Sequence, residues 1–316
     1  MSETLLWDLL RGPMTTRALA LTAELRIADE LADGPRPVAE LAESTGADRD
    51  TLYRTLRALA SDGVFAEDEP GVFRNTDASE LLRRDGWTEF AHLFGSVFYD
   101  ALRGFPQRFE HDFWEWLAAH PAERDAFDTA MSGGKERQAE RLAALEWEGV
   151  ETVVDVGGGN GELLRGLLRR RPELRGIVFD LPQVVPGAAN VLAEAGVDDR
   201  AELVGGDYFA SVPAGGDVYV ISHVSHQLSD EEAITVLRNV REAMDPEGRV
   251  VIIDPVLPEG DTPHPGKFMD ITMMTLTHGG DRTEAELAAL LRSASLRLVR
   301  TVALSAPSSV VVAVPS

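Results

Sequence analysis

A length of 316 residues is sufficient for two domains, and the absence of cysteine excludes disulfides, thiolate metal sites and a cysteine nucleophile. The formal net charge of −23 and the pI of about 4.6 argue against nucleic acid and anionic membranes as partners, because both bind basic patches. The first residues lack the basic and apolar regions of a leader, and no apolar run reaches membrane-spanning length, so we expect a cytoplasmic protein.

Residues 14–84 are predicted to form helices followed by a small ribbon. Apolar residues at helical spacing predict helices over 18–31, 38–46 and 48–63. Two short apolar pairs then flank the acidic turn 67–71, which predicts a hairpin. Three helices and a ribbon form a winged-helix pattern, but the acidic turn would repel phosphate. We therefore expect this shape to serve protein contact, in particular dimerisation.

Residues 86–147 are predicted to be mostly helical and are rich in aromatic side chains. Most of these would pack in the core. Some are expected to face a substrate cavity, together with methionines of a later helix that can adapt to a flat aromatic molecule. The candidate substrate contacts are Phe98, Tyr99, Phe113, Phe127, Met131, Met269 and Met273.

From residue 150 onward, apolar runs alternate with helical patterns, which predicts a doubly wound α/β sheet. The expected strands are 151–156, 175–180, 201–205, 217–222, 249–254, 296–304 and 308–314. Only three residues separate the last two strands. They are therefore expected to form an antiparallel hairpin at the edge of the sheet.

A glycine-rich loop follows the first of these strands. The strand ends in Asp155, and the alternate glycines Gly157, Gly159 and Gly161 come next. Glycines at a strand end leave room for a ligand to approach the backbone closely. The second strand ends in Asp180, whose carboxylate can accept hydrogen bonds from both hydroxyls of a ribose. The pattern predicts a nucleoside-containing cofactor, with a ligand-free turn as the less favoured alternative.

The residue after the third glycine discriminates among such cofactors. A dinucleotide fingerprint requires glycine at the sixth place of the loop, where this chain has Glu162. A carboxylate there would oppose a pyrophosphate at a helix N-terminus. No Gly-Lys-Ser/Thr follows, which excludes a P-loop. A nucleoside cofactor without phosphates remains, and S-adenosylmethionine (SAM) fits this description.

Three polar residues are expected to meet near the cofactor. His226 lies in the loop after the fourth strand, Asp254 ends the fifth, and Asp281 lies in a later turn. A histidine after a strand is more often structural than catalytic, and Asp281 could instead cap the helix that begins near Thr283. His223 and His226 precede a capped helix with no third ligand spaced beside them, so no metal is predicted.

Several stretches, taken in chain order, resemble the SAM-dependent small-molecule O-methyltransferases of the plant caffeate/flavonoid type and their actinobacterial relatives. The matching stretches are Asp155–Gly161, Val178–Val184, Gly206–Phe209, His226 with Ser229–Asp230, Asp254–Pro258 and Gly279–Thr283. The resemblance implies a homodimer with a winged-helix-like dimerisation domain over residues 1–100. A helical linker and a Rossmann-like SAM-binding catalytic domain would occupy residues 101–316.

The resemblance also implies a role for each matched residue. His226 would be the general base that deprotonates a hydroxyl of an aromatic or polyketide-like acceptor, and Asp254 and Asp281 would flank it. The implied cofactor contacts are Asp155, Gly157, Gly159, Gly161, Asp180, Leu181, Asp207, Tyr208 and Ser222. Among these, Asp180 would bind the ribose, and Asp207 and Tyr208 would lie beside the adenine.

The chain departs from the family at the cofactor end of the site. Gln227-Leu228 replaces the usual Asp-Trp, and Ser222 replaces a lysine that is common four residues before the histidine. Some relatives bind SAM but catalyse hydroxylation, decarboxylation or pericyclic reactions. A SAM-binding enzyme repurposed in this way is therefore the alternative function, and a ligand-sensing winged-helix regulator is a remote one.

Overall fold

The computed structural model describes residues 2–83, 86–105, 109, 112–305 and 308–316. The chain divides into two compact units, one of residues 1–104 with 114–134 and the other of residues 105–113 with 135–316. Each unit is considered by itself below. The predicted domains, a dimerisation domain over residues 1–100 and a catalytic domain with its helical linker over residues 101–316, stay a prediction.

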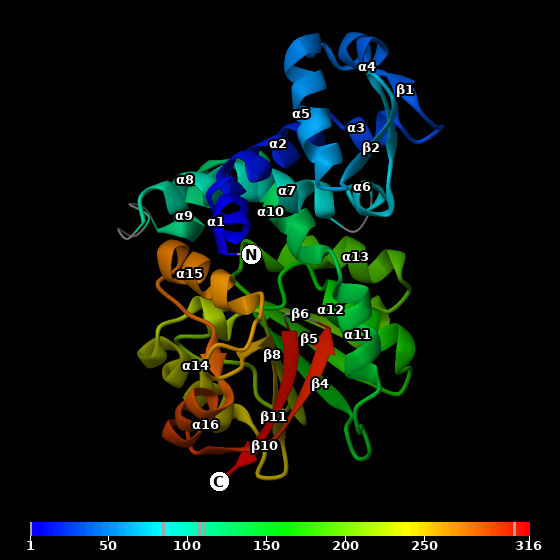
Figure 1. Ribbon diagram of the computed structural model, residues 1–316. Coiled ribbons are helices and arrows are strands. Elements are labelled where there is room, and N and C mark those ends of the chain that lie inside the picture. Colours follow the sequence, from blue (N-terminus) through cyan, green and yellow to red (C-terminus); the bar gives the residue numbers. More distant parts are fainter. Residues whose placement is uncertain (1, 84–85, 106–108, 110–111, 306–307) are drawn as a thin grey trace. The chain divides into compact units, whose positions relative to one another are not determined.

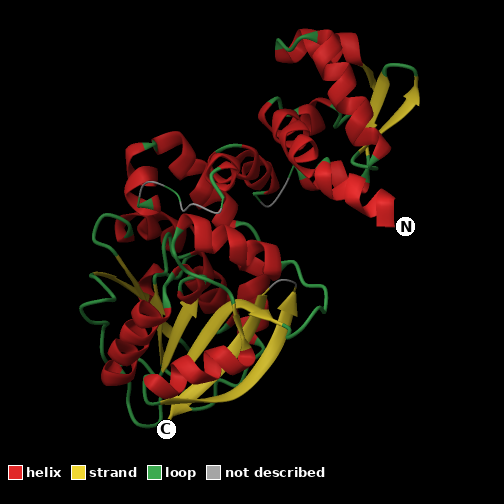
Figure 2. Cartoon of the chain, turned by 60° about the vertical axis from the view of Figure 1, so that its left-hand side comes forward, coloured by secondary structure: helices red, strands yellow, loops and turns green. Residues whose placement is uncertain are grey.

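The first unit is mostly helical (Figure 1). Its helices are α1 (Ser2–Leu10), α2 (Gly12–Glu24), α3 (Ile27–Glu30), α4 (Val38–Thr45), α5 (Arg49–Ser61), α6 (Asp77–Leu81), α7 (Trp87–Gly95), α8 (Val97–Arg103), α9 (Phe113–Ala119, of which the first residue belongs to the second unit) and α10 (Pro121–Ser132). Three short strands, β1 (Arg36–Pro37), β3 (Val72–Asn75) and β2 (Phe65–Glu69), pair antiparallel in that order. Figure 2 shows this ribbon beside the N-terminal helices, as a winged-helix pattern requires.

The helix predicted over 18–31 is interrupted. Arg26 adopts a left-handed conformation with φ of 54° and separates α2 from α3. Ala23, Ile27 and Leu31 nevertheless keep helical spacing across the break and reach one buried core. The third predicted helix, α5, begins as expected, because the carboxylate of Asp48 accepts a hydrogen bond from Thr51 N at 2.8 Å.

The second unit is a doubly wound α/β sheet. Its helices are α11 (Lys135–Ala143), α12 (Glu162–Arg170), α13 (Ala188–Glu194), α14 (Asp230–Ala243), α15 (Gly266–Leu276) and α16 (Glu284–Ser293). Its strands are β4 (Thr152–Val156), β5 (Arg175–Asp180), β6 (Ala201–Gly205), β7 (Val218–Ser222), β8 (Arg249–Leu257), β9 (Arg282–Thr283), β10 (Leu296–Ser305) and β11 (Ser308–Pro315). The seven predicted strands are all confirmed, but β8 continues to Leu257, so the expectation that it ends in Asp254 is wrong. The strand β9 is an addition.

The strand order of the main sheet is β10-β11-β8-β7-β4-β5-β6, with β9 paired to β8. The strands β4 to β8 run parallel, whereas β10 and β11 are antiparallel. The predicted edge hairpin is confirmed by the pairing of Ser305 with Ser308, while its turn residues Ala306 and Pro307 lie outside the described residues. From β4 the chain winds outward to β6 and then returns to β7. The order therefore reverses between β4 and β7, which is where such folds bind ligands.

Both faces of this sheet are covered by helices. α14 and α16 pack on one face, and α11, α12 and α13 on the other (Figure 1). Successive strand residues alternate between the two cores, so Ile252 joins the first and Ile253 the second. Burial on both faces explains why the strands appear as continuous apolar runs in the sequence. In the described part of the chain, no helix is long and apolar enough to cross a bilayer.

Candidate active site

The glycine loop begins at the point where the strand order reverses. Gly157, Gly159 and Gly161 all have left-handed φ angles, of 71°, 56° and 76°. At Gly157 a Cβ atom would also lie only 2.6 Å from Val224 Cγ2. A side chain there would meet both backbone strain and a steric clash, so the loop keeps its shape only with glycine.

Asp180 is fixed at the end of β5. Its Oδ2 accepts a hydrogen bond from Gly159 N at 2.8 Å, and its Oδ1 accepts one from Leu181 N at 2.7 Å. A carboxylate oxygen has two lone pairs and can accept more than one hydrogen bond. The side chain of Leu181 is 41% exposed and provides an apolar surface next to this carboxylate.

The loop after β6 is held in place from α14. Asn239 Nδ2 donates to the carbonyls of Tyr208 and Phe209 at 2.8 and 3.0 Å, and Asp207 accepts from Phe209 N at 2.8 Å. Burial, reinforced by the charges of Asp180 and Asp207, raises the pKa of Tyr208 to about 12, so the phenol stays neutral. Asn239 was not among the residues predicted from the sequence, and Phe209 was named only as the end of a matching stretch.

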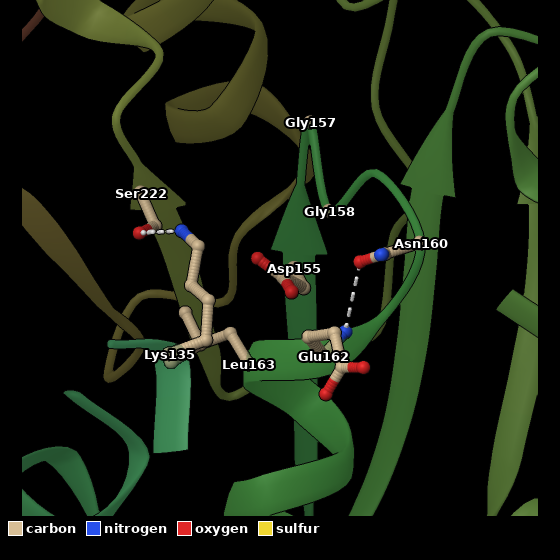
Figure 3. Close-up of a pocket in the computed structure, with 8 residues that line it drawn as sticks. All are labelled: Lys135, Asp155, Gly157, Gly158, Asn160, Glu162, Leu163 and Ser222. Atoms are coloured by element: carbon tan, nitrogen blue, oxygen red, sulfur yellow. Dashed lines mark hydrogen bonds between the residues drawn. The ribbon is translucent and has the colours of Figure 1, made fainter. Parts of the chain in front are cut away.

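A small pocket lies between the ends of β4 and β7 (Figure 3). It is lined by Lys135, Asp155, Gly157, Gly158, Asn160, Glu162, Leu163 and Ser222. Asp155 is 2% exposed, and burial raises the pKa of its carboxyl group to about 7 although Lys135 opposes this shift. Lys135 Nζ donates to Ser222 Oγ at 3.1 Å.

Lys135 was not predicted as a site residue, although the sequence contains a pattern that indicates its inward position. Lys135 precedes Ala139 and Leu142, the buried residues of α11, at the same helical spacing. A lysine on a buried stripe points toward the interior of the protein.

The structure brings His226, Asp254 and Asp281 together. His226 lies in a short 3-10 turn, Ser225–Gln227, and its Nδ1 is 3.0 Å from Asp281 Oδ1. The side chains of His226 and Asp281 are 10% and 0% exposed. Burial by itself would lower the pKa of His226, but the charges of Asp254 and Asp281 outweigh burial and raise this pKa. The hydroxyl of Ser225 donates to Asp254.

Asp281 does not cap the following helix, because Thr283 occupies that position and accepts a hydrogen bond from Glu286 N. Asp281 is instead held by its own backbone, whose N–H donates to Asp270 Oδ1 of α15 at 2.9 Å. Its carboxylate is therefore available to the imidazole of His226.

Arg282 ties the histidine loop to the Asp281 turn. Its Nη1 donates to the carbonyl of Ser225 at 2.8 Å, its Nη2 to the carbonyl of Leu228 at 2.7 Å, and its Nε to Asp230 at 2.9 Å. These acceptors lie on both sides of His226. The guanidinium thus fixes the loop that carries the imidazole, a role that the sequence analysis did not predict.

A second histidine lies beside the first. Burial and the nearby Lys135 and His226 lower the pKa of His223 well below its ordinary value. Its Nε2 is 2.8 Å from Gln138 Nε2, which can donate a hydrogen bond to the neutral ring. His223, His226 and Asp254 each offer one potential metal ligand within 4.8 Å of the others, and the absence of a metal stays a prediction.

The seven candidate substrate contacts are divided between the two units. Phe98, Tyr99, Phe127 and Met131 belong to the first unit, and Phe113, Met269 and Met273 to the second. Phe98, Phe113, Phe127 and Met273 are buried, whereas Tyr99, Met131 and Met269 are half-buried. That these residues contact one substrate stays a prediction.

Residues 87–297 match the O-methyltransferase domain, and residues 7–85 match the O-methyltransferase dimerisation domain. The chain belongs to the O-methyltransferase family. The resemblance predicted from the sequence is thereby confirmed, as is the SAM-dependent methyltransferase fold.

Three proteins illustrate the range of relatives that this chain resembles. The phenazine O-methyltransferase of Lysobacter antibioticus is 39% identical over 99% of this chain and 96% of its own length. The aclacinomycin 10-hydroxylase of Streptomyces purpurascens is 33% identical over 90% of this chain and 82% of its own length. An O-methyltransferase from neocarzinostatin biosynthesis, solved with SAM and 2-hydroxy-5-methyl naphthoic acid, has a TM-score of 0.82 at 33% identity and 96% coverage of both chains.

Proposed function

We propose that the protein transfers the methyl group of SAM to a hydroxyl group of an aromatic or polyketide-like small molecule, with His226 as the general base. The contact of His226 Nδ1 with Asp281 Oδ1 at 3.0 Å carries the proposal. The phenazine and naphthoic acid relatives support an aromatic acceptor. A cytoplasmic location and the absence of nucleic acid binding stay predictions.

The described residues fit SAM. When bound, SAM supplies a methyl group made electrophilic by a sulfonium. Asp180 would bind the ribose hydroxyls, and Leu181, Asp207 and Tyr208 would contact the adenine. The glycine loop, Asp155 and Ser222 would hold the methionine part. The buried Asp155 Oδ2 supports this assignment, because it has no hydrogen-bond partner within the described residues.

The acid–base chemistry follows from His226 and the two neighbouring carboxylates, Asp254 and Asp281. A phenol has an ordinary pKa of about 10 and is mostly protonated at neutral pH, so the reaction benefits from a base. Asp281 accepts a hydrogen bond from Nδ1–H, which leaves Nε2 of His226 to take the proton of the acceptor hydroxyl. The charges of Asp254 and Asp281 then stabilise the imidazolium that forms.

The rate should fall at acid pH with a midpoint above the ordinary histidine pKa of about 6.5. The reason is that only the neutral imidazole can act as a base, and Asp254 and Asp281 favour its protonated form. Asp281→Asn removes one of these charges, which lowers the pKa of His226 and moves the acid limb of kcat/KM to lower pH. Initial rates of S-adenosylhomocysteine formation across the pH range test this expectation. Asp270→Asn, at the neighbouring carboxylate, is the matched control, and an equal shift in both variants would contradict the assignment.

The alternative function is a SAM-binding enzyme that does not transfer the methyl group. The hydroxylase relative favours this alternative, and so does Gln227, whose side chain donates to the carbonyl of His223 at 2.6 Å where the family usually has an aspartate. Product analysis separates the two functions, because only methyl transfer forms S-adenosylhomocysteine. The remote alternative, a winged-helix regulator, requires binding to duplex DNA at low salt.

We also propose a homodimer that forms through the first unit. Its helix α1 exposes Leu6, Trp7 and Leu10 by 60%, 66% and 69%, and residues 7–85 match a dimerisation domain. Leu6→Glu with Leu10→Glu places two charges on one face of this helix. Burying an unpaired charge costs at least about 3 kcal/mol, so dissociation should rise more than about a hundredfold. Light scattering should then detect monomers, whereas Val299→Glu, at a similarly exposed residue of β10, should remain dimeric. A dimeric double variant would contradict the assignment.

A further inference from the structure

Lys135 reaches from α11 to the end of β7. It is the first residue of the helix, and its side chain extends past Asp155 to Ser222, where Nζ donates to Oγ at 3.1 Å (Figure 3). The ammonium group therefore lies in the pocket at the glycine loop, between the two strands where the sheet order reverses.

This ammonium group is poorly satisfied by the protein. Burial lowers the pKa of Lys135, while the charges of Asp155 and Asp254 oppose that shift. Across the described ranges, no carboxylate lies within 4.0 Å of Nζ, and the one hydrogen-bond acceptor is the neutral hydroxyl of Ser222. An ammonium group has three donors, and leaving donors without acceptors in a buried place is unfavourable. A bound anion would supply the missing acceptors.

The same pocket contains the complementary charge. Asp155 has a buried Oδ2 that no described residue hydrogen-bonds. The pocket thus presents a positive and a negative group to the same small volume. Gly157 and Gly158 of the glycine loop line the same pocket (Figure 3). A zwitterion, the form of an α-amino acid at neutral pH, can satisfy both groups at once.

We infer that Lys135 binds the α-carboxylate of the methionine part of SAM, and that the hydroxyl of Ser222 orients its ammonium group. The inference rests on the proposed function and adds to it a contact residue from α11. The carboxylate of Asp155 lies in the same pocket and would bind the α-ammonium group of the same ligand. Specificity for a cofactor with an amino-acid end would then depend on a side chain outside the glycine loop and the strands.

The experiment compares two ligands by calorimetric titration. SAM carries the amino-acid end, and 5′-methylthioadenosine lacks it. Lys135→Met should weaken SAM binding about 10- to 100-fold, the usual range for a hydrogen bond to a charged group, and leave 5′-methylthioadenosine binding unchanged. Arg137→Met removes an exposed cation from the same helix and should change neither affinity. Equal losses for both ligands, or unchanged or tighter SAM binding, would overturn the inference.

Exchanging the two residues provides a second test. Ser222→Lys alone would crowd two ammonium groups, whereas Lys135→Ser combined with Ser222→Lys returns one ammonium group to the pocket from the opposite side. The double variant should recover at least part of the SAM affinity lost in Lys135→Ser. No recovery would mean that an ammonium charge in this pocket does not bind the carboxylate, which would contradict the inference. If the unaltered protein binds neither ligand, the proposed function fails and this inference fails with it, whereas unchanged SAM binding in Lys135→Met contradicts this inference alone.

Discussion

His226→Ala is expected to lower kcat by about two to four orders of magnitude, the usual contribution of a general base. The affinity for SAM should remain nearly unchanged, because the proposed cofactor contacts come from other residues. Single-turnover formation of S-adenosylhomocysteine with a phenolic acceptor measures the first effect, and calorimetry measures the second. A loss of rate without a loss of SAM affinity assigns His226 to the chemical step.

Two comparisons make the result specific. His92→Ala removes a histidine of α7 in the first unit and should retain the full rate. Asp281→Asn added to His226→Ala should cost little more than His226→Ala alone, because the acid acts through the imidazole. If His226→Ala keeps more than about a tenth of the rate, general-base catalysis by this residue is wrong.

Asp180→Ala is expected to weaken SAM binding by at least about a hundredfold. Each hydrogen bond from a ribose hydroxyl to a carboxylate contributes about 1.5–3 kcal/mol, and two such bonds would be lost. The N–H groups of Gly159 and Leu181 would also lose their acceptor, so the glycine loop would be less well fixed. Titration with SAM and with adenosine should show parallel losses, because both ligands carry the ribose.

Asp217 offers a matched control. Its carboxylate also accepts two backbone hydrogen bonds, from Glu151 N and Thr152 N at 2.8 Å, but it lies at the opposite ends of the strands. Asp217→Ala should lower thermal stability to a similar extent and retain SAM affinity. If both variants lose affinity equally, the effect of Asp180→Ala arises from the fold and not from the ribose.

The strands were predictable because each is a short apolar run bounded by polar residues. The end of β5 is an example, since the apolar run in the sequence and the strand in the structure both end at Asp180. The break at Arg26 was not predictable, because its helical spacing continues and only packing against the core favours the left-handed turn. The strand β9 has only two residues and forms by pairing with β8, so it has no apolar pattern in the sequence that could predict it.

The site was predictable where its residues follow strands. His226 lies just beyond the end of β7, and Asp254 lies in β8 directly after Ile253, the last β8 residue that pairs with β7. Parallel pairing brings such positions to one edge of the sheet. Lys135 and Arg282 were missed because their partners are distant in the chain. Ser222 is 87 residues from Lys135, and Ser225 is 57 residues from Arg282. Contacts of this kind depend on how α11 and β9 pack, which local sequence patterns do not encode.

Arg282 has a consequence for how this enzyme could diversify. The guanidinium, His226 and Asp281 all belong to the second unit, and their hydrogen bonds are completed within it. Mutations among residues 87–104 and 114–134 would leave these bonds intact. The proton-accepting group would therefore keep its geometry while the helices of the first unit change in sequence. A lineage built on this chain could vary that unit without first losing its chemistry.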